Sequence, residues 1–393
     1  MQRAIRLQTD ATACKRAILK EFSIKAVSLA NLLLKNRTSK KLMDLHKAMY
    51  STCKETTSFN SQVICDIERS VVRSKGTNLK AITVKFNVPR NCKTFQTKTR
   101  TFIELGMYPR KRTAVPLRHN RNLQRYSSLL QGGWTCKTYG LTSDGQIVAY
   151  LSKEAEIPIR RNMLGVDVNS KCFAVSVLTP EGKILKQLYL GKDIWVKRKR
   201  IFERRERLQS FADRGSHRAR QQLIRLKTKE QNFVRNRIGE VVRDITNLAV
   251  EYDADVAIEK LTRFKPKGRR FNKEVLRIPT FLFRTTLESR CFDKNIRLHL
   301  VNAYHTSKWC SHCGAVAKRG HSSNYALFKC GNCGQIVNSD RKASLAVAVK
   351  SLLVRDKHVS NQSASFQFTS RRVSVNGLFR SDDGVLDYAV HDI

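Results

Sequence analysis

Apolar residues recur at helical spacing along the first part of the chain, from Ala13 to Leu34 and again from Leu42 to Ile67. Few Gly or Pro residues interrupt these two stretches, and Lys and Arg residues lie among the apolar positions. The pattern therefore predicts that residues 1–75 are mostly helical.

Between residues 79 and 160 the pattern changes to an alternation of apolar and polar side chains, which is typical of β-strands. The alternation is seen in Ile82–Phe86 and in Thr101–Leu105. The segments Thr135–Leu141 and Gln146–Leu151 flank an Asp-Gly pair, which predicts a hairpin with a tight turn. This part of the chain is therefore predicted to be a small, basic β unit.

A third pattern begins at Met163, where short apolar segments separated by turn residues predict three strands. These strands are Met163–Asn169, Cys172–Leu178 and Lys183–Leu190. The first of them carries a carboxylate, Asp167, near its end. Because RNase H-like sheets begin with such a meander, we expect a domain of this α/β fold class after the β unit.

Four further segments complete that domain. Residues 193–250 have helical periodicity that is broken near Gly215. Strands are predicted at Asp253–Leu261 and Arg297–Val301, and Asn338–Leu352 has the pattern of a capped helix. From residue 355 to 393 the periodicity is lost and polar residues increase, so we expect a disordered tail.

Three carboxylates stand at the ends of separate elements: Asp167 on the first strand, Glu259 on the fourth, and Asp340 in the first turn of the last helix. Taken singly, each is compatible with a solvated strand end or a helix cap. In an RNase H-like sheet, however, these positions converge, and converging carboxylates repel one another unless cations neutralise them. Oxygen ligands favour Mg²⁺ or Mn²⁺, so the trio predicts a catalytic site for two-metal phosphodiester hydrolysis. We expect Asp253 and Asp255 on the exposed side of their strand, without a role.

The charge balance narrows the class of function. Lys and Arg number 75 against 32 Asp and Glu, which gives a formal net charge of +43. A compact body with this charge repels itself unless a polyanion neutralises it, which excludes an ordinary enzyme of small metabolites and predicts nucleic acid as partner. The chain has no run of about 18 apolar residues and no signal peptide, so we expect no membrane and a cytoplasmic location.

The 11 Cys residues include two close pairs of the form Cys-x-x-Cys. The four residues are Cys310, Cys313, Cys330 and Cys333. This doubled spacing predicts a structural Zn²⁺ site with four thiolate ligands in a reducing compartment. Gly314 and Gly334 follow the second Cys of each pair, where the chain must turn with positive φ. His312 and His321 are expected at the surface, because four thiolates complete the site.

In the order and spacing of these motifs the chain resembles TnpB, a family of transposon-encoded RNA-guided nucleases that is similar to the type V CRISPR effectors. The matching segments are Phe59–Gln62, Gly165–Asn169, Ile258–Leu261, Thr306–Gly314, Phe328–Gly334 and Asp340 with its helix. The resemblance extends to about Leu353, and Thr306–Asp340 is its most specific part.

The resemblance implies a domain organisation. Residues 1–160 would form a wedge-like β domain with a helical recognition insertion at about 11–75. Residues 161–354 would form a split RNase H-like (RuvC-like) nuclease domain. That domain would contain a helical insertion at about 193–250 and a zinc-ribbon insertion at about 305–337.

The resemblance also implies a function, an RNA-guided DNA endonuclease with Asp167, Glu259 and Asp340 as the metal ligands. Guide RNA and target DNA would be the partners, with one protein monomer for each guide RNA. Sequence specificity would come from guide pairing, while the protein holds the backbone and the shape of the heteroduplex. The chain departs from the family pattern at Lys342, where Asn is usual, and at Lys308, where Gln is usual.

Two other functions stay open at this point. One is an RNA-guided protein that holds DNA without cutting it and acts as a repressor, an interpretation with which Lys342 beside the carboxylates is compatible. The other is a conventional RNase H-like transposase or recombinase, since such enzymes share the same carboxylates.

Overall fold

The computed structural model describes residues 1–169, 171–260, 279–303, 305–313, 319–320, 326–355, 371–372 and 391–392. The chain divides into two compact units, Met1–Ala155 and Glu156–Ile393, and each is described by itself. The tail predicted to be disordered lies outside the described residues, apart from Arg355 and the short antiparallel pair β16 (Arg371–Arg372) and β17 (His391–Asp392).

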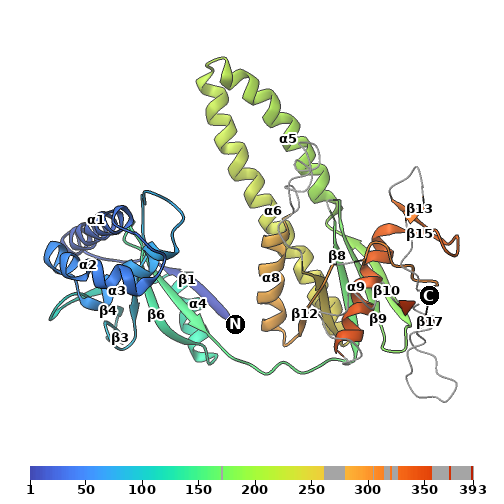
Figure 1. Ribbon diagram of the computed structural model, residues 1–393, viewed down its shortest axis with the longest axis horizontal. Coiled ribbons are helices and arrows are strands. Elements are labelled where there is room, and N and C mark those ends of the chain that lie inside the picture. The colour runs from blue at the N-terminus through green and yellow to red at the C-terminus, as the bar shows by residue number, and fades with distance from the viewer. Residues whose placement is uncertain are drawn as a thin grey trace. The chain divides into compact units, whose positions relative to one another are not determined.

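The first unit combines antiparallel sheets with helices (Figure 1). Its strands are β1 (Gln2–Leu7), β2 (Val84–Asn87), β3 (Cys92–Gln96), β4 (Thr101–Tyr108), β5 (Lys111–Pro116), β6 (Thr135–Leu141) and β7 (Ile147–Ser152). Its helices are α1 (Ala13–Lys35), α2 (Leu42–Thr57), α3 (Ser61–Arg73) and α4 (Arg121–Gln131). The strands form two sheets, with the orders β1-β7-β6-β2 and β3-β4-β5. The hairpin predicted at Asp-Gly is confirmed as β6 and β7, with Gly145 at φ +76°.

Two elements of the first unit do not follow from the sequence patterns. Strand β1 lies within the part predicted to be mostly helical, and it pairs antiparallel with β7, which is distant in sequence. Helix α4 lies within the part predicted as β structure. The side chain of Asn120 caps α4 by accepting hydrogen bonds from the backbone N–H groups of Asn122 and Leu123.

The second long periodic stretch of the first unit is divided into two helices. Helix α2 ends at Thr57, and Ser58 adopts a left-handed conformation with φ of 55°. The side chain of Asn60 then accepts a hydrogen bond from the N–H of Gln62 and caps α3. The apolar positions continue at helical spacing across this break, so periodicity alone does not reveal it.

The second unit is built on a five-stranded sheet with the order β10-β9-β8-β11-β12. Its strands are β8 (Asn162–Val168), β9 (Phe173–Leu178), β10 (Ile184–Leu190), β11 (Ala254–Glu259) and β12 (Leu298–Val301). The strands β8, β9 and β10 form an antiparallel meander, as predicted, whereas β11 is parallel to both β8 and β12. Helices cover both faces of this sheet. They are α5 (Lys192–Asp213), α6 (His217–Glu251), α8 (Thr280–Asp293) and α9 (Ser339–Arg355).

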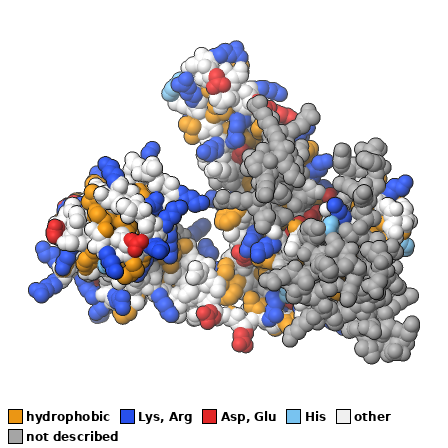
Figure 2. All heavy atoms as spheres, in the orientation of Figure 1, with side chains coloured by type: hydrophobic (Ala, Val, Ile, Leu, Met, Phe, Trp, Pro, Cys, Tyr) orange, Lys and Arg blue, Asp and Glu red, His pale blue; other side chains and the backbone are white. Residues whose placement is uncertain are grey.

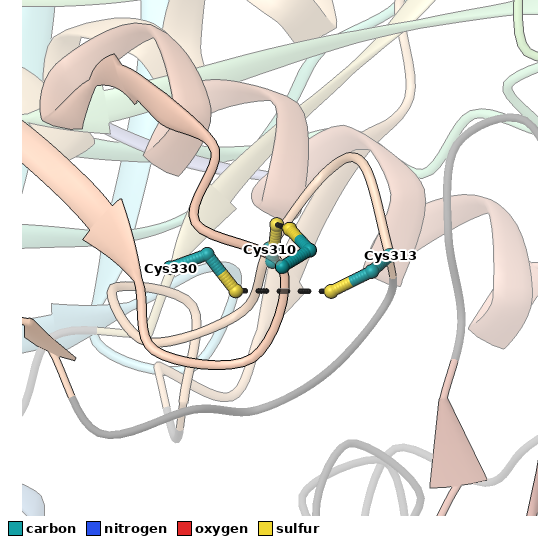
Figure 3. Close-up of side chains that lie close together, drawn as sticks. Cys310, Cys313 and Cys330 are labelled. Atoms are coloured by element: carbon teal, nitrogen blue, oxygen red, sulfur yellow. Dashed lines mark hydrogen bonds between the residues drawn. The ribbon is translucent and has the colours of Figure 1, made fainter.

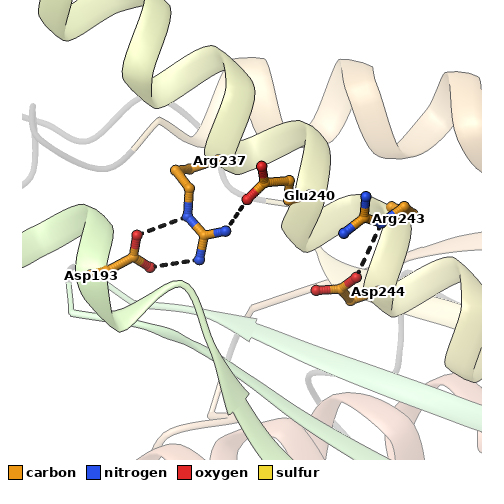
Figure 4. A network of polar contacts seen from close by, with 5 residues as sticks. All are labelled: Asp193, Arg237, Glu240, Arg243 and Asp244. Carbon is orange, nitrogen blue, oxygen red and sulfur yellow. Dashed lines mark hydrogen bonds and ion pairs between the residues drawn. The ribbon is translucent and has the colours of Figure 1, made fainter.

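Helices α5 and α6 form a long hairpin that extends beyond the sheet (Figure 1). Its base is held by ion pairs (Figure 4): Arg237 of α6 donates to both carboxylate oxygens of Asp193 at 2.7 and 2.8 Å and also pairs with Glu240. The hairpin turns near Gly215, at φ +96°, where the sequence predicted a break. No helix in the described ranges is long and apolar enough to cross a membrane.

Helix α9 crosses the sheet very close to β8. At Gly165 of β8, a Cβ atom would overlap the carbonyl oxygen of Ser344 and lie 2.6 Å from the backbone nitrogen of Ala348. Glycine is therefore required at this position, and it lets the backbone of α9 lie directly on the strand. Before α9, the short strands β13 (Arg319–Gly320), β14 (Leu327–Cys330) and β15 (Ile336–Asn338) form a small separate sheet.

Candidate functional site

The alternation of side chains along two neighbouring strands brings Asp167 and Glu259 to the same face of the sheet. Met163 of β8 and Ala257 of β11 pack in the core beneath α9, whereas the residues next to them pack against α6 and α8. Successive side chains of a strand point to opposite faces. Asp167, four residues after Met163, and Glu259, two residues after Ala257, therefore lie on the α9 face.

The third predicted carboxylate reaches this place from the start of α9. The side chain of Asn338 caps the helix by accepting hydrogen bonds from the N–H groups of Asp340 and Arg341, each at 3.1 Å. The hydroxyl of Tyr189 donates to the same oxygen at 2.6 Å. Asn169, just beyond β8, donates from Nδ2 to Oδ1 of Asp340 at 2.6 Å and so links the end of the strand to the helix.

The pKa of Asp167 is affected by the other two carboxylates. Its pKa is raised to about 8, first because burial penalises the charged form, and then because of repulsion by Glu259 and Asp340. Lys342 opposes this shift. The three predicted carboxylates are therefore brought together, and without an added cation one of them would retain a proton near neutral pH.

Glu259 is oriented by Thr306, whose hydroxyl donates to Oε1 of Glu259 at 2.5 Å and also to the carbonyl of Ala303 at 3.0 Å. Burial raises the pKa of Glu259, and the hydrogen bond from Thr306 and the charges of Lys350 and Lys342 partly offset this effect. The carboxylate is thus held in a fixed direction by a neutral donor.

Two lysines of α9 are buried near these carboxylates. Lys342 is only 2% exposed, and its Nζ donates to the carbonyl oxygens of Thr306 at 3.2 Å and of Trp309 at 3.0 Å. The Nζ of Lys350 donates to the carbonyl of Asn302 at 2.7 Å, and burial lowers the pKa of Lys350 to about 8. Lys342 therefore joins α9 to the segment that carries both Thr306 and the first cysteine pair.

The four clustered cysteines come together as predicted, with all four sulfur atoms within 4.8 Å of one another. The Sγ atoms of Cys310 and Cys333 are 3.8 Å apart, and those of Cys313 and Cys330 are 3.7 Å apart (Figure 3). Four sulfurs at about 2.3 Å from one tetrahedral ion lie roughly 3.8 Å from each other. This spacing is too long for disulfides and fits a structural zinc ion.

The turn after the second cysteine pair is also as expected. Gly334 has φ of +71°, and its N–H donates to the carbonyl of Cys330 at 3.0 Å. Asn332 donates from its backbone to the sulfur of Cys330 at 3.4 Å. Gly314 and His321 lie outside the described residues, and His312 is exposed, as expected.

The four cysteines and the group of His46, Cys65 and Glu68 are the sets whose ligand atoms lie within 4.8 Å of one another in the described chain. The three carboxylates around Asp167 are spread more widely than this. Such a spread is wider than the coordination shell of one ion, and a site of this width would suit more than one divalent ion.

Basic side chains line hollows on both units, and Figure 2 shows Lys and Arg side chains scattered over the described surface. A cleft of about 780 Å³ between α5 and α6 is bordered by Arg198, Arg205, Lys227 and Arg235. In the first unit, Arg90, Arg110, Lys111 and Arg112 line a smaller hollow of about 360 Å³.

The structure corrects one expectation near the carboxylates. Asp255 was expected on an exposed side, but it is fully buried, and its Oδ2 lies 3.2 Å from Nε2 of His299. The prediction failed because β12 and the helices cover this end of β11. Asp253 is exposed and pairs with Arg160, in agreement with the expectation.

Sequence reasoning assigned no role to Thr306, Asn169 or Lys350. Thr306 and Asn169 both lie inside matched motifs, close to the first cysteine pair and to Asp167. Their position in these motifs was the one sequence feature that could have indicated a role for them. Their hydrogen bonds to Glu259 and Asp340 depend on how α9 packs, which sequence spacing does not report.

Comparison with known proteins gives three findings. The Cas12f1-like TNB domain family matches residues 282–347. A TnpB-like protein of Aquifex aeolicus is 28% identical over 220 residues, which are 49% of this chain and 68% of that protein. A solved Cas12f1 structure, a complex with sgRNA and target DNA, has a similar fold, with a TM-score of 0.62 at 13% identity, and covers 86% of this chain and 83% of that one.

The family match covers most of α8, the cysteine cluster and the first half of α9, and the matching relative is TnpB-like. The chain is therefore similar in sequence to a TnpB-like protein and in fold to Cas12f1.

Proposed function

We propose that this protein is an RNA-guided DNA endonuclease that hydrolyses phosphodiester bonds with divalent metal ions held by Asp167, Glu259 and Asp340. The observation that carries this proposal is the convergence of the three carboxylates, expressed in the raised pKa of Asp167. Three carboxylates are costly to bury together unless cations neutralise them, so their assembly at one site favours a metal-dependent function.

The topology supports an RNase H-like (RuvC-like) nuclease domain. An antiparallel meander is followed by two parallel strands, and the carboxylates come from the first strand, the fourth strand and a following helix. The domain is split, because α5 and α6 separate the meander from β11 and the cysteine segment precedes α9. We propose that this segment is a zinc-ribbon insertion.

The same proposal identifies the domains in the rest of the chain. Residues 1–160 would be the wedge-like β domain, with the recognition insertion at about 11–75. The boundary between the compact units, at Ala155, lies close to the end of the proposed β domain.

The donor set of the site fits Mg²⁺ or Mn²⁺, because carboxylate oxygens are hard ligands. Divalent ions held by Asp167, Glu259 and Asp340 would supply activation of a water molecule and stabilisation of the charge on the leaving oxygen. The chain itself orients the ligands: Thr306 fixes Glu259 through its hydroxyl, and Asn169 fixes Asp340 through its amide. Such supporting contacts tune metal affinity and ligand direction.

Guide RNA and target DNA are the partners we propose. The formal charge of +43 and the basic clefts would neutralise phosphates. The similar Cas12f1 was solved with sgRNA and target DNA. Base pairing by the guide would select the target, and the protein would recognise backbone and duplex shape in the cytoplasm of the host.

The first experiment is to sequence the nucleic acid that copurifies with the protein from its native host. We expect one dominant RNA with a constant scaffold and a defined variable end. The protein with that RNA should then cut matching DNA in Mg²⁺, and Asp167→Ala or Glu259→Ala should abolish cutting. Asp253→Asn is the matched control, because Asp253 is an exposed carboxylate at the other end of β11 and Asn tolerates its φ of +44°.

Other outcomes of these experiments would favour a different function. Unrelated RNA and DNA fragments without a dominant species would contradict guidance by RNA, and strand-transfer products would indicate a recombinase. Tight retention of matching DNA without breaks would indicate a repressor. Equal cutting by wild type, Asp167→Ala and Glu259→Ala would show that the site is wrongly assigned.

A further inference from the structure

A second group of metal-ligating side chains lies in helices α2 and α3 of the first unit, and none of its members belongs to the sites described above. His46 comes from α2, and Cys65 and Glu68 come from α3. Cys65 and Glu68 are three residues apart, so they share one face of α3. The Nδ1 of His46 lies 2.8 Å from Oε2 of Glu68, and one ligand atom from each of the three residues lies within 4.8 Å of the others.

The carboxylate of Glu68 is incompletely satisfied. Its side chain is 1% exposed, and among the described residues its Oε1 is buried with no hydrogen-bond partner. A buried carboxylate oxygen without a hydrogen-bond partner is unfavourable, and more so when it is charged. An ion pair between His46 and Glu68 leaves this oxygen unsatisfied and gives no role to the thiol of Cys65.

We propose that His46, Cys65 and Glu68 bind a divalent metal ion of borderline softness, with Zn²⁺ as the best fit. Imidazole nitrogen, thiolate sulfur and carboxylate oxygen are all zinc ligands, whereas a thiolate disfavours Mg²⁺ and Ca²⁺. Ligand atoms within 4.8 Å need only a small contraction to surround one ion. The side chain of His46 is 32% exposed, so water can supply a fourth ligand from that side.

The position of the group gives this ion a structural consequence. Helices α2 and α3 are joined by a break at Ser58–Asn60, and the ion would tie one helix to the other across it. The proposal is independent of the nuclease proposal, because none of its residues belongs to the carboxylate or four-cysteine groups.

The test is a count of zinc per full-length chain by elemental mass spectrometry after desalting. The count is made with the additional change Asp167→Asn in every sample, so that zinc bound by the three carboxylates does not contribute. We expect two zinc ions in this reference protein and a loss of one in Cys65→Ser and in His46→Gln. Cys14→Ser, which removes an exposed thiol outside the group, should keep two.

Cobalt substitution gives a second, spectroscopic readout of the same site. Thiolate-to-cobalt charge-transfer absorption should come from both sites in the reference protein, and Cys65→Ser should remove the part due to the single thiolate. His46→Gln changes a partly exposed residue, so a folded variant is expected even if Cys65→Ser destabilises α3. One zinc in the reference protein, or two in both ligand variants, would overturn the proposal.

Discussion

Thr306 illustrates how one neutral side chain can set the direction of a buried carboxylate. Its hydroxyl donates to Glu259 at 2.5 Å, while the loop that holds Thr306 is itself held by Lys342 through the carbonyl oxygen of Thr306. Burial raises the pKa of Glu259, and the donor partly compensates. At this scale, the chemistry of the site depends on residues that bind no metal.

We expect Thr306→Val to lower the rate of DNA cleavage by about 10- to 100-fold, the range found when a residue supporting a metal ligand is removed. Valine has nearly the same shape as threonine but lacks the hydroxyl group that donates the hydrogen bond to Glu259. Thr306→Ser keeps the hydroxyl and should stay close to wild type. Single-turnover cleavage at several Mg²⁺ concentrations measures the effect, and equal rates for Thr306→Val and Thr306→Ser would show that the hydrogen bond is unimportant.

At the scale of elements, the contact between α9 and β8 determines where Asp340 lies relative to Asp167. The contact exists because Gly165 has no side chain and because Ala346 and Ala348 are buried on the helix. Ser176 of β9 and Ser344 of α9 also lie 2.6 Å apart through their hydroxyl oxygens. The helix is therefore held in one position on the sheet by close packing.

We expect Gly165→Ala to lower the free energy of unfolding by roughly 1–3 kcal/mol, because the added methyl group overlaps the backbone of α9. The control is Gly239→Ala within α6, where a Cβ meets no atom within 4 Å. That change should stabilise the protein by about 0.5–1 kcal/mol, since Ala favours a helix interior. Urea unfolding measures both, and a neutral result at Gly165 would contradict the close approach.

The base of the helical hairpin offers a test that depends on pH. The hydrogen bond from Arg237 lowers the pKa of Asp193, so its contribution to stability is fully present above its ordinary value of 3.8. The contribution is lost as pH falls through the lower value in the folded state. Asp193→Asn should therefore destabilise the protein at neutral pH, by less than about 1 kcal/mol because both partners are over a third exposed.

Urea unfolding from neutral pH down to the acid range would measure this difference. The gap between wild type and Asp193→Asn should shrink only below about pH 4. Asp213→Asn, at the far end of α5, is a control because Asp213 contacts Gln209 and not Arg237. A gap that grows on acidification would contradict the ion pair as its source.

The cysteine cluster is expected to fold with its metal. A zinc-selective chelator should increase hydrogen exchange in residues 305–313 and 326–338, while β8 and β9 in the sheet core stay protected. Cys330→Ser should act in the same way. Protection that is unchanged by the chelator would mean that packing of Trp309 and Phe328, both buried, is sufficient to hold the segment.

At the scale of the whole molecule, we expect the excess of positive charge to govern the proposed association with nucleic acid. The basic residues occur in both compact units and line the hollows found in each. Each phosphate neutralised releases counterions, so affinity should fall steeply with salt. No individual basic residue is expected to determine the target, because pairing with the guide would do so.

We expect the logarithm of the RNA affinity to fall linearly with the logarithm of salt concentration, by about 0.7–0.9 for each phosphate contacted. Arg235→Gln, at the edge of the α5–α6 cleft, should weaken binding and reduce the slope by roughly one contact. Gln231→Ala, a neutral change in the same cleft, should leave the slope unchanged. An unchanged slope for Arg235→Gln would show that the cleft does not contact the backbone.

Much of the architecture follows from local sequence. The short apolar segments of β8 and β9, the helical periodicity of α5 and α6, and the Asp-Gly turn before β7 are determined by short-range preferences. Cysteine spacing and net charge can be read from the sequence without knowledge of the fold. The cysteine cluster was therefore predictable from the sequence alone. The order of Asp167, Glu259 and Asp340 also follows from the chain, because each marks the end of a recognisable element.

Only the tertiary structure decides what each element contacts. The sheet order puts β11 beside β8, and the packing of α9 then brings Thr306, Asn169 and Lys342 to the carboxylates. The same long-range packing buries Asp255 and pairs β1 with β7. These contacts join residues far apart in the chain, and no local periodicity or composition records which face one element presents to another.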